Sequence, residues 1–191
     1  MRKRLILASS SPRRQDLLKQ VHMPFLIRHS NIDEPQISTT DPVEKVKQLA
    51  TLKNLALSVQ KDDVILSADT VVAYQQHIFE KPKDKEAAAR MITTLSGDIH
   101  DVFTGVMIRS IDHEVLFVEQ TQVEFWPLSQ EDITPYIHTS EPYDKAGAYG
   151  IQSIGAQFVK QIIGDYYNVV GLPLSRVVRE LAEFGITPTY G

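Results

Sequence analysis

The chain has 191 residues, with 20 Lys+Arg against 24 Asp+Glu and a formal net charge of −4 at pH 7. This length suits one domain with a sizeable core, and the acidic balance argues against a general affinity for nucleic acid or anionic membranes. Because there is no cysteine, disulfides and thiolate metal sites are excluded.

The first half of the chain alternates strands and helices. Its start is basic, but the apolar run that follows, residues 5–8, is too short for a signal peptide or a membrane span, so we expect a cytoplasmic protein without a membrane partner. Ser11, Asp41 and Asp84 are good N-caps and mark three helix starts. The expected elements are a strand at 4–9, helices at 12–20 and 42–58, a strand at 64–74 and a helix at 84–95.

The second half of the chain pairs its strands as hairpins. The expected elements are strands at 100–109 and 114–126, a helix at 129–138, an irregular stretch at 141–155, strands at 157–163 and 166–171, and a helix at 173–184. Alternation followed by hairpins predicts an α/β protein with a mixed β-sheet and flanking helices. Since there is no clear linker or repeat, we interpret residues 1–191 as a single domain with a cleft between its halves.

Two arginines stand at the start of the first helix. Arg13 and Arg14 follow Pro12 in LASSSPRRQDLL, where the unpaired N–H groups of the helix start disfavour a cation. Two interpretations are open: both side chains extend into water, or an anion completes a site at this helix start.

Two charged residues fall where apolar side chains are expected. Lys53 lies near the centre of the apolar face of the second helix, and it either snorkels to water or binds an anionic partner. Asp69 interrupts VILSADTVV, a run that should be buried, so its carboxylate needs a cation, a metal or hydrogen-bond donors. A structural ion pair and a catalytic group both satisfy that need.

Further charged residues lie in loops. Lys81 and Lys83 bracket Pro82, while adjacent Asp33 and Glu34 offer the oxygen ligands that Mg²⁺ and Mn²⁺ prefer. Each group by itself is also typical of a solvated loop. Taken together, cations in separate segments and isolated carboxylates are the residues needed to hold a polyphosphate through a divalent metal and to attack it with water.

Six stretches of the sequence, in this order, resemble motifs of the Maf family of nucleotide pyrophosphatases. They are LILASSSPRRQDLL, the Asp33-Glu34 loop, SADTVV, EKPKDKEAAARMITTLSG, EPYDKAGAYGIQ and DYYNVVGLPL. The resemblance implies a mixed sheet with two lobes around a deep cleft, similar to the inosine triphosphate pyrophosphatases. It also implies a cytoplasmic enzyme, usually a homodimer, that uses a divalent metal cation. The implied reaction cleaves nucleoside triphosphates between the α and β phosphates to a monophosphate and pyrophosphate, as nucleotide-pool housecleaning.

The resemblance further implies roles for individual residues. Asp69 matches the proton acceptor that activates water, and Glu34 matches its partner at the metal. The positions that match phosphate-holding cations are Arg14, Lys53 and Lys81, and those that match residues setting base choice are Arg13, Thr70 and Gln152. This combination resembles the branch that acts on dTTP and UTP, with modified pyrimidine nucleotides as further expected substrates.

Two alternatives accompany this resemblance, and Glu80, Tyr143 and Ser153 depart from the family pattern. The chain is alternatively a nucleotide-sensing regulator of cell division and septum formation with little hydrolysis, or a pyrophosphatase for a modified purine nucleotide such as 7-methyl-GTP. The 7-methyl-GTP branch typically carries an aromatic residue in place of Arg13. Glu80 stands where a small residue is common in the family. Its carboxylate would repel phosphate unless it points away or joins the metal shell.

Overall fold

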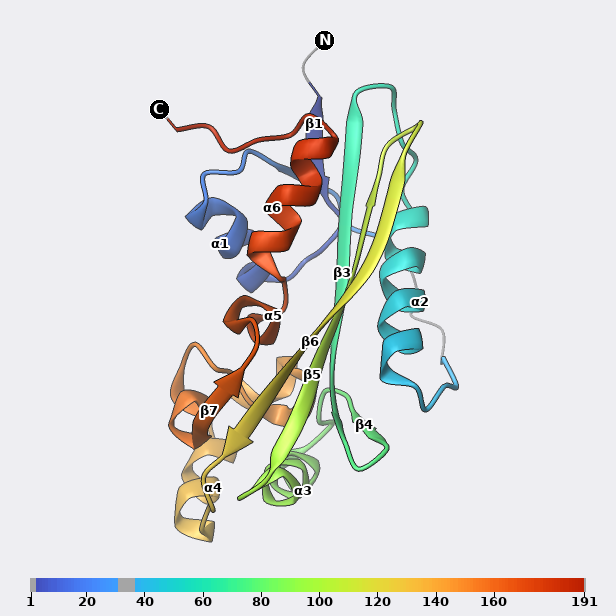
Figure 1. Ribbon diagram of the computed structural model, residues 1–191. Coiled ribbons are helices and arrows are strands. Elements are labelled where there is room, and N and C mark those ends of the chain that lie inside the picture. Colours follow the sequence, from blue (N-terminus) through green and yellow to red (C-terminus); the bar gives the residue numbers. More distant parts are fainter. Residues whose placement is uncertain (1–2, 31–36, 191) are drawn as a thin grey trace.

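A mixed β-sheet organises the structure, a computed structural model that describes residues 3–30 and 37–190 (Figure 1). In these residues the sheet has seven strands in the order β2-β1-β3-β5-β6-β7, and β4 pairs with β3. The strands are β1 Arg4–Leu7, β2 Leu26–Ile27, β3 Asp63–Tyr74, β4 His77–Phe79, β5 Ile99–Arg109, β6 Glu114–Phe125 and β7 Val159–Ile163. β1 runs parallel to β2 and β3, whereas the other pairs are antiparallel. The predicted mixed sheet is therefore confirmed.

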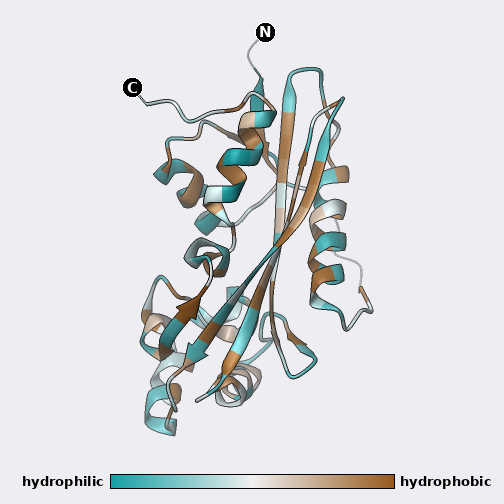
Figure 2. Ribbon diagram, in the orientation of Figure 1, coloured by the Kyte–Doolittle hydropathy of each residue, from teal (hydrophilic) through white to brown (hydrophobic). Residues whose placement is uncertain are grey.

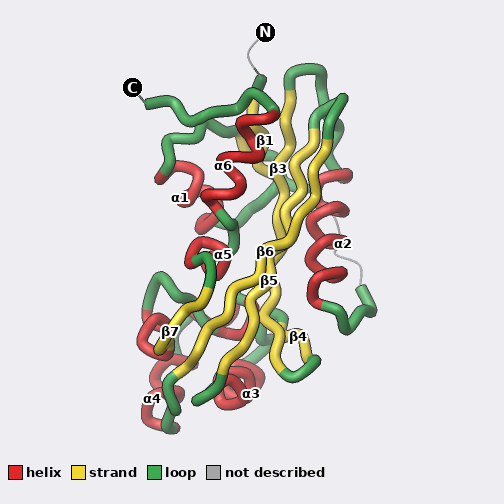
Figure 3. Tube along the Cα trace, viewed as in Figure 1, coloured by secondary structure: helices red, strands yellow, loops and turns green. Residues whose placement is uncertain are grey.

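Helices flank both faces of this sheet (Figure 3). The helices are α1 Pro12–Gln20, α2 Pro42–Leu55, α3 Lys85–Leu95, α4 Gln130–Ile137, α5 Tyr166–Val170 and α6 Leu174–Glu183, with 3₁₀ turns η1 Glu141–Asp144, η2 Ala146–Ala148 and η3 Ile154–Phe158. α2 lies on one side of the long strands, and α1, α5 and α6 lie on the other (Figure 1). Across the described residues, no helix combines the length and apolarity that a bilayer span requires.

Local signals locate two helix starts correctly. The Asp41 carboxylate accepts hydrogen bonds from the amides of Val43 and Glu44, and the Asp84 carboxylate accepts one from the amide of Ala87. These bonds satisfy amides that have no partner inside the helix, as expected for N-caps.

One predicted strand is a helix. The sequence predicts a strand at 166–171, and this prediction is wrong because Tyr166–Val170 form α5. Asn168 is fully buried there, and its Nδ2 donates to the Val102 carbonyl and the Thr121 hydroxyl, each at 3.0 Å. These bonds to β5 and β6 hold a helical turn in place of the strand that the aromatic and β-branched residues favour.

Other element boundaries differ by a few residues from those expected. The strand expected at 4–9 ends at Leu7, the helix expected at 42–58 ends at Leu55, and the strand expected from 157 begins at Val159 after η3. The short strands β2 and β4 are not predicted, because two or three residues carry too little periodicity to be recognised.

Side chains of β3 alternate between the two faces of the sheet. Toward α2, the Ser67 hydroxyl donates to a main-chain carbonyl of that helix and Asp69 pairs with Lys53. Toward α1, the hydroxyl of Thr70 accepts a hydrogen bond from Arg14. Consecutive residues of one strand therefore contact different helices.

One edge of β3 is open at these residues. β5 pairs with residues 65–73 along the opposite edge. On the open edge, β1 pairs with 63–66 and β4 with 72–74, so in the described part of the chain no strand covers 67–71. Beside the gap between the ends of β1 and β4, Asp69 and Thr70 are partly exposed and point to opposite faces of the sheet, whereas Ser67 is buried.

Two large buried clusters lie on either side of this gap (Figure 2). One joins β1 and the start of β3 to α1 and α6, and the other joins the far ends of β5 and β6 to α3 and α4. α2 comes very close to the sheet at Gly105, where an added Cβ would lie 2.4 Å from the Val46 carbonyl oxygen. This close approach brings the apolar face of α2, together with Lys53, against the sheet at β3.

A buried histidine in the second cluster makes stability depend on pH. His100 is 1 % exposed, its Nε2 lies 2.8 Å from the Tyr149 hydroxyl, and its Nδ1 has no hydrogen-bond partner in the described residues. Burial lowers the pKa of His100 from 6.5 to about 4, against a smaller opposing effect of Asp98. Below pH 6.5 the unfolded chain therefore binds a proton that the folded chain excludes. The free energy of unfolding thus decreases as the pH is lowered from 6.5 to about 4.

We expect the His100→Phe variant to lack this part of the acid destabilisation. The wild-type protein should lose about 3 kcal/mol of unfolding free energy through this group between pH 7 and pH 4. Phenylalanine keeps the ring contacts with Phe125 and Tyr149 but cannot be protonated. Urea unfolding of both proteins across this pH range measures the difference, and parallel curves would contradict the assignment.

Candidate active site

A cavity of about 790 Å³ opens at the uncovered edge of β3. Its walls come from the loop between β1 and α1, α2, β3, the loop after β4, and the segments around η1–η2 and α5. Every described residue that the sequence singled out for the site lines it: Arg13, Arg14, Lys53, Asp69, Thr70, Lys81 and Gln152. Glu34, the remaining predicted metal ligand, lies outside the described residues. The predicted set is thus brought together, while the roles of its members stay predictions.

Arg14 is held inside the cavity wall. Its Nε donates to the Gly171 carbonyl at 2.7 Å, and its Nη2 donates to the Thr70 hydroxyl at 3.1 Å. Its Nη1 donates to the Ser9 hydroxyl at 3.4 Å. Gly171 ends α5 at φ +123°, a conformation that favours glycine. Of the two open interpretations, a side chain extended into water is therefore wrong for Arg14.

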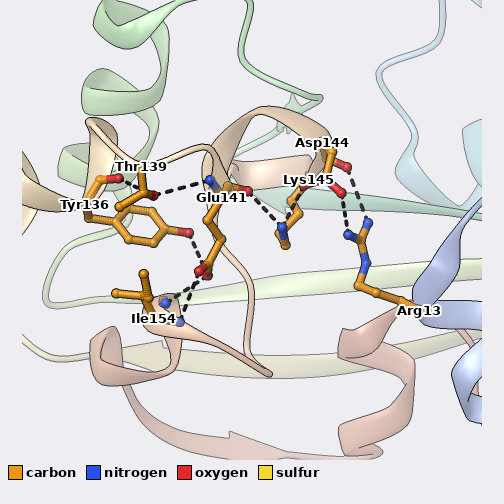
Figure 4. A network of polar contacts seen from close by, with 8 residues as sticks. Arg13, Tyr136, Thr139, Glu141, Asp144, Lys145 and Ile154 are labelled. Atoms are coloured by element: carbon orange, nitrogen blue, oxygen red, sulfur yellow. Dashed lines mark hydrogen bonds and ion pairs between the residues drawn. The ribbon is translucent and has the colours of Figure 1, made fainter.

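Arg13 bridges to the opposite wall of the cavity (Figure 4). Its Nη1 donates to Asp144 Oδ2 at 2.6 Å, and Lys145 Nζ donates to Asp144 Oδ1 at 2.6 Å. Burial opposes ionisation of Asp144, but the hydrogen bonds and charges of Lys145 and Arg13 outweigh it and lower the pKa of Asp144. Asp144 is therefore an anion between two cations at the cavity wall.

Lys53 and Asp69 form an ion pair on the α2 side of β3. Lys53 Nζ donates to Asp69 Oδ1 at 2.5 Å, and the two side chains are only 15 % and 14 % exposed. The Asp69 carboxylate thus meets a cation, as its position in an apolar run requires, and keeps one oxygen for a ligand in the cavity.

A further cation lies beside the predicted ones. Lys45 precedes Lys53 by eight residues on α2, and its side chain is 12 % exposed and paired with Glu80. The sequence analysis missed Lys45, because at about 100° per residue it falls well away from the apolar face that singled out Lys53. Because Glu80 lines the cavity next to Lys81 but is paired with Lys45, its departure from the family pattern is offset by a local cation.

The predicted base-choice residues occupy different surroundings. The Thr70 hydroxyl is 2.8 Å from the Thr104 hydroxyl and also accepts from Arg14, so it belongs to a hydrogen-bonded chain within the protein. Gln152 is exposed on a loop at the other side of the cavity. Arg13 faces that same side through Asp144. Gln152 and Arg13 therefore both present polar groups to the cavity.

The cavity suits a ligand of high negative charge. The described lysines and arginines that line it are Arg13, Arg14, Lys53, Lys81 and Lys145, and the described carboxylates are Asp69, Glu80 and Asp144. Positive charge is therefore in excess there, although the whole chain carries a net charge of −4. Local excess of this kind attracts phosphates.

The donor set fits a metal ion that arrives with the ligand. Within the described residues, no three histidine, aspartate or glutamate side chains gather to hold an ion. Asp69 nevertheless offers a carboxylate oxygen in the cavity. Mg²⁺ is usually bound by one or two carboxylates together with substrate phosphates and water, so a single described ligand is compatible with such a site.

The chain is similar to known proteins along most of its length. Residues 4–184 match the family model described as Maf-like protein. A relative from Geobacillus sp. (strain WCH70), named dTTP/UTP pyrophosphatase, is 53% identical over 184 residues, which cover 96% of this chain and 99% of that protein. A relative of the same name from Bacillus cytotoxicus is 47% identical over 183 residues, covering 95% of this chain and 96% of that one.

One solved structure is similar in fold. A HAM1 protein from Coxiella burnetii superimposes with a TM-score of 0.53 at 10% sequence identity, covering 95% of this chain and 99% of that chain. This likeness concerns the arrangement of strands and helices only. With the family model matched from the first strand to the last helix and with close relatives over nearly the full length, the chain belongs to the Maf family.

Proposed function

We propose that this protein hydrolyses dTTP and UTP, together with modified pyrimidine nucleoside triphosphates, to the monophosphate and pyrophosphate. The observation that carries the proposal is the Lys53–Asp69 pair, which lies in one cavity with Arg14 and Lys81. The names of the Geobacillus and Bacillus relatives support the choice of substrates. Clearing such nucleotides from the cellular pool is the role that follows from this reaction.

Asp69 acts as the general base in the proposed reaction. Its carboxylate takes a proton from a water molecule as the water oxygen forms a bond to the α-phosphorus. The bond from the α-phosphorus to the bridging oxygen then breaks, and pyrophosphate leaves with the electron pair. Lys53 orients the carboxylate by binding Oδ1, which leaves Oδ2 for the water.

Charge neutralisation by the cavity supplies the rest of the proposed catalysis. Arg14, Lys53 and Lys81 bind phosphate oxygens and offset the charge that develops on the leaving pyrophosphate. A divalent cation, Mg²⁺ or Mn²⁺, held by Asp69 and Glu34, supplies further charge neutralisation at the phosphates when it is bound. Arg14 is already fixed by three hydrogen bonds, so little order is lost when phosphate binds.

A substrate panel with purified protein tests the proposal. Pyrophosphate release is measured with Mg²⁺ or Mn²⁺ for dTTP, UTP, their 5-modified forms, CTP, dITP and 7-methyl-GTP. We expect dTTP and UTP to have the highest kcat/KM. Binding without pyrophosphate release would favour a nucleotide-sensing regulator, and a preference for 7-methyl-GTP or dITP would favour a purine pyrophosphatase.

We also propose that the enzyme works as a cytoplasmic homodimer, as the family resemblance implies. Light scattering of the purified protein should then give twice the mass of one chain, and cell fractionation should recover the activity with the cytoplasm. A single-chain mass at micromolar concentration would contradict the dimer.

A further inference from the structure

The loop that carries Gln152 has little regular structure of its own. It lies between the 3₁₀ turns η2 and η3 and lines one side of the cavity. Loop backbone of this kind needs hydrogen-bond partners from elsewhere to hold one conformation. Just after Gln152, at the start of η3, the Glu141 carboxylate accepts hydrogen bonds from the amides of Ile154 and Gly155, each at 3.0 Å (Figure 4).

The backbone that precedes Gln152 in the sequence also packs against the Glu141 carboxylate. A Cβ added at Gly150 would lie 2.6 Å from Lys145 Cε and 3.1 Å from Glu141 Oε1, so this backbone lies directly against both side chains. The Tyr136 hydroxyl donates to Glu141 Oε1 at 3.2 Å and fixes the carboxylate from the side of α4. Glu141 therefore contacts the loop on both sides of Gln152.

A second connection runs from Glu141 to Arg13. Lys145 Nζ donates to the Glu141 main-chain carbonyl at 2.8 Å and also binds Asp144. Asp144 in turn accepts from Arg13, which lies on α1 across the cavity. The segment that begins with Glu141 thus contacts Arg13 through Asp144, and it contacts the backbone on both sides of Gln152 through the Glu141 carboxylate (Figure 4).

The ionised state of Glu141 suits this role. Burial opposes ionisation, but the hydrogen bonds from the amides of Gly155 and Ile154 and from the hydroxyls of Ser153 and Tyr136 outweigh it and lower the pKa of Glu141. An ionised carboxylate accepts stronger hydrogen bonds than a neutral acid does. Glu141 does not line the cavity among the described residues, so it acts through others.

We propose that Glu141 is a positioning residue for nucleobase selection: its carboxylate fixes the 150–155 loop so that Gln152 meets the base of the bound nucleotide. The inference rests on the proposed function. UTP and CTP differ at base position 4, where one carries a carbonyl and the other an amino group. A Gln152 amide held with its NH₂ group toward position 4 donates to the carbonyl of UTP but meets no acceptor in the amino group of CTP, whereas an amide free to turn pairs with either.

Two substitutions at Glu141 test this inference. Glu141→Ala removes both acceptors, and Glu141→Gln keeps the size of the side chain and one acceptor oxygen. We expect Glu141→Ala to raise KM for UTP and dTTP about tenfold and to lower the preference for UTP over CTP about tenfold. Because the Asp69 side of the cavity is untouched, kcat should change less than threefold. Glu141→Gln should fall between the wild type and Glu141→Ala.

The matched control is Glu131→Gln, the same change of charge on the exposed first turn of α4. It should leave the kinetics unchanged. A double variant then tests whether Glu141 acts through Gln152. If it does, Gln152→Ala and Glu141→Ala each lower the preference, and combining them lowers it no further.

The inference and the proposed function fail in different ways. If the wild-type protein releases no pyrophosphate from UTP or dTTP, the proposed function is wrong. If the wild type is active but folded Glu141→Gln keeps the wild-type KM and UTP preference, the positioning role is overturned. The positioning role would also be overturned if the folded variants lost kcat equally on all nucleotides. Additive effects of Glu141→Ala and Gln152→Ala on the UTP preference would overturn it as well.

Discussion

Asp69→Asn is expected to lower kcat for dTTP about 1,000-fold, because an amide cannot take the proton of the attacking water. Asparagine has nearly the same size and keeps an oxygen that accepts from Lys53, whose Nζ lies 2.5 Å from the carboxylate. Nucleotide binding should therefore persist, because the cations Arg14, Lys53 and Lys81 of the cavity are unchanged. Steady-state pyrophosphate release gives kcat, and calorimetric titration with an α,β-imido analogue of dTTP gives the dissociation constant.

A control for Asp69→Asn is available on the surface of the same protein. Asp16→Asn alters an exposed carboxylate of α1 that forms a surface ion pair with Lys19, so it should leave kcat unchanged. A turnover of Asp69→Asn within tenfold of the wild type would show that Asp69 is not the general base. Circular dichroism verifies that both variants fold.

Lys53→Met is expected to weaken binding of the dTTP analogue about 100-fold, because it removes a largely buried cation from the cavity. It also leaves the Asp69 carboxylate, 14 % exposed, without this counter-charge. Breaking a buried pair on one side lowers the unfolding free energy by about 3 kcal/mol, which the two large buried clusters should tolerate. Titration and urea unfolding measure the two effects separately.

The double variant Lys53→Met/Asp69→Asn separates a binding role from a structural one. Removing the second charge should recover most of the lost stability but none of the lost affinity. Lys47→Met, the same change elsewhere on α2, should alter neither. If Lys53→Met loses stability and keeps its affinity for nucleotide, the lysine serves the fold alone.

The elements with strong local signals are those that the sequence predicts well. Capping carboxylates locate the starts of α2 and α3, and long runs of β-branched residues locate β3, β5 and β6. The prediction at 166–171 fails because Asn168 binds two partners on neighbouring strands. Sequence periodicity contains no information about such distant partners.

For the candidate site too, the sequence predicts the residues but not their contacts. Periodicity places Lys53 on an apolar helix face, and an interrupted apolar run singles out Asp69, but neither pattern shows that the two side chains meet. For Arg14 the sequence leaves open whether the side chain is solvated. The structure decides this because its partners Thr70 and Gly171 come from β3 and the end of α5.

The sequence by itself determined the α/β class with a mixed sheet, the family and the residue types available for phosphate chemistry. These depend on hydropathy patterns, caps and motif order, which are local properties of the chain. Only the tertiary structure decided that the predicted residues share one cavity and that Glu141 supports the loop of Gln152. The physical reason is that the cavity exists where β1 and β4 leave an edge of β3 uncovered, and that gap arises from pairing between distant segments.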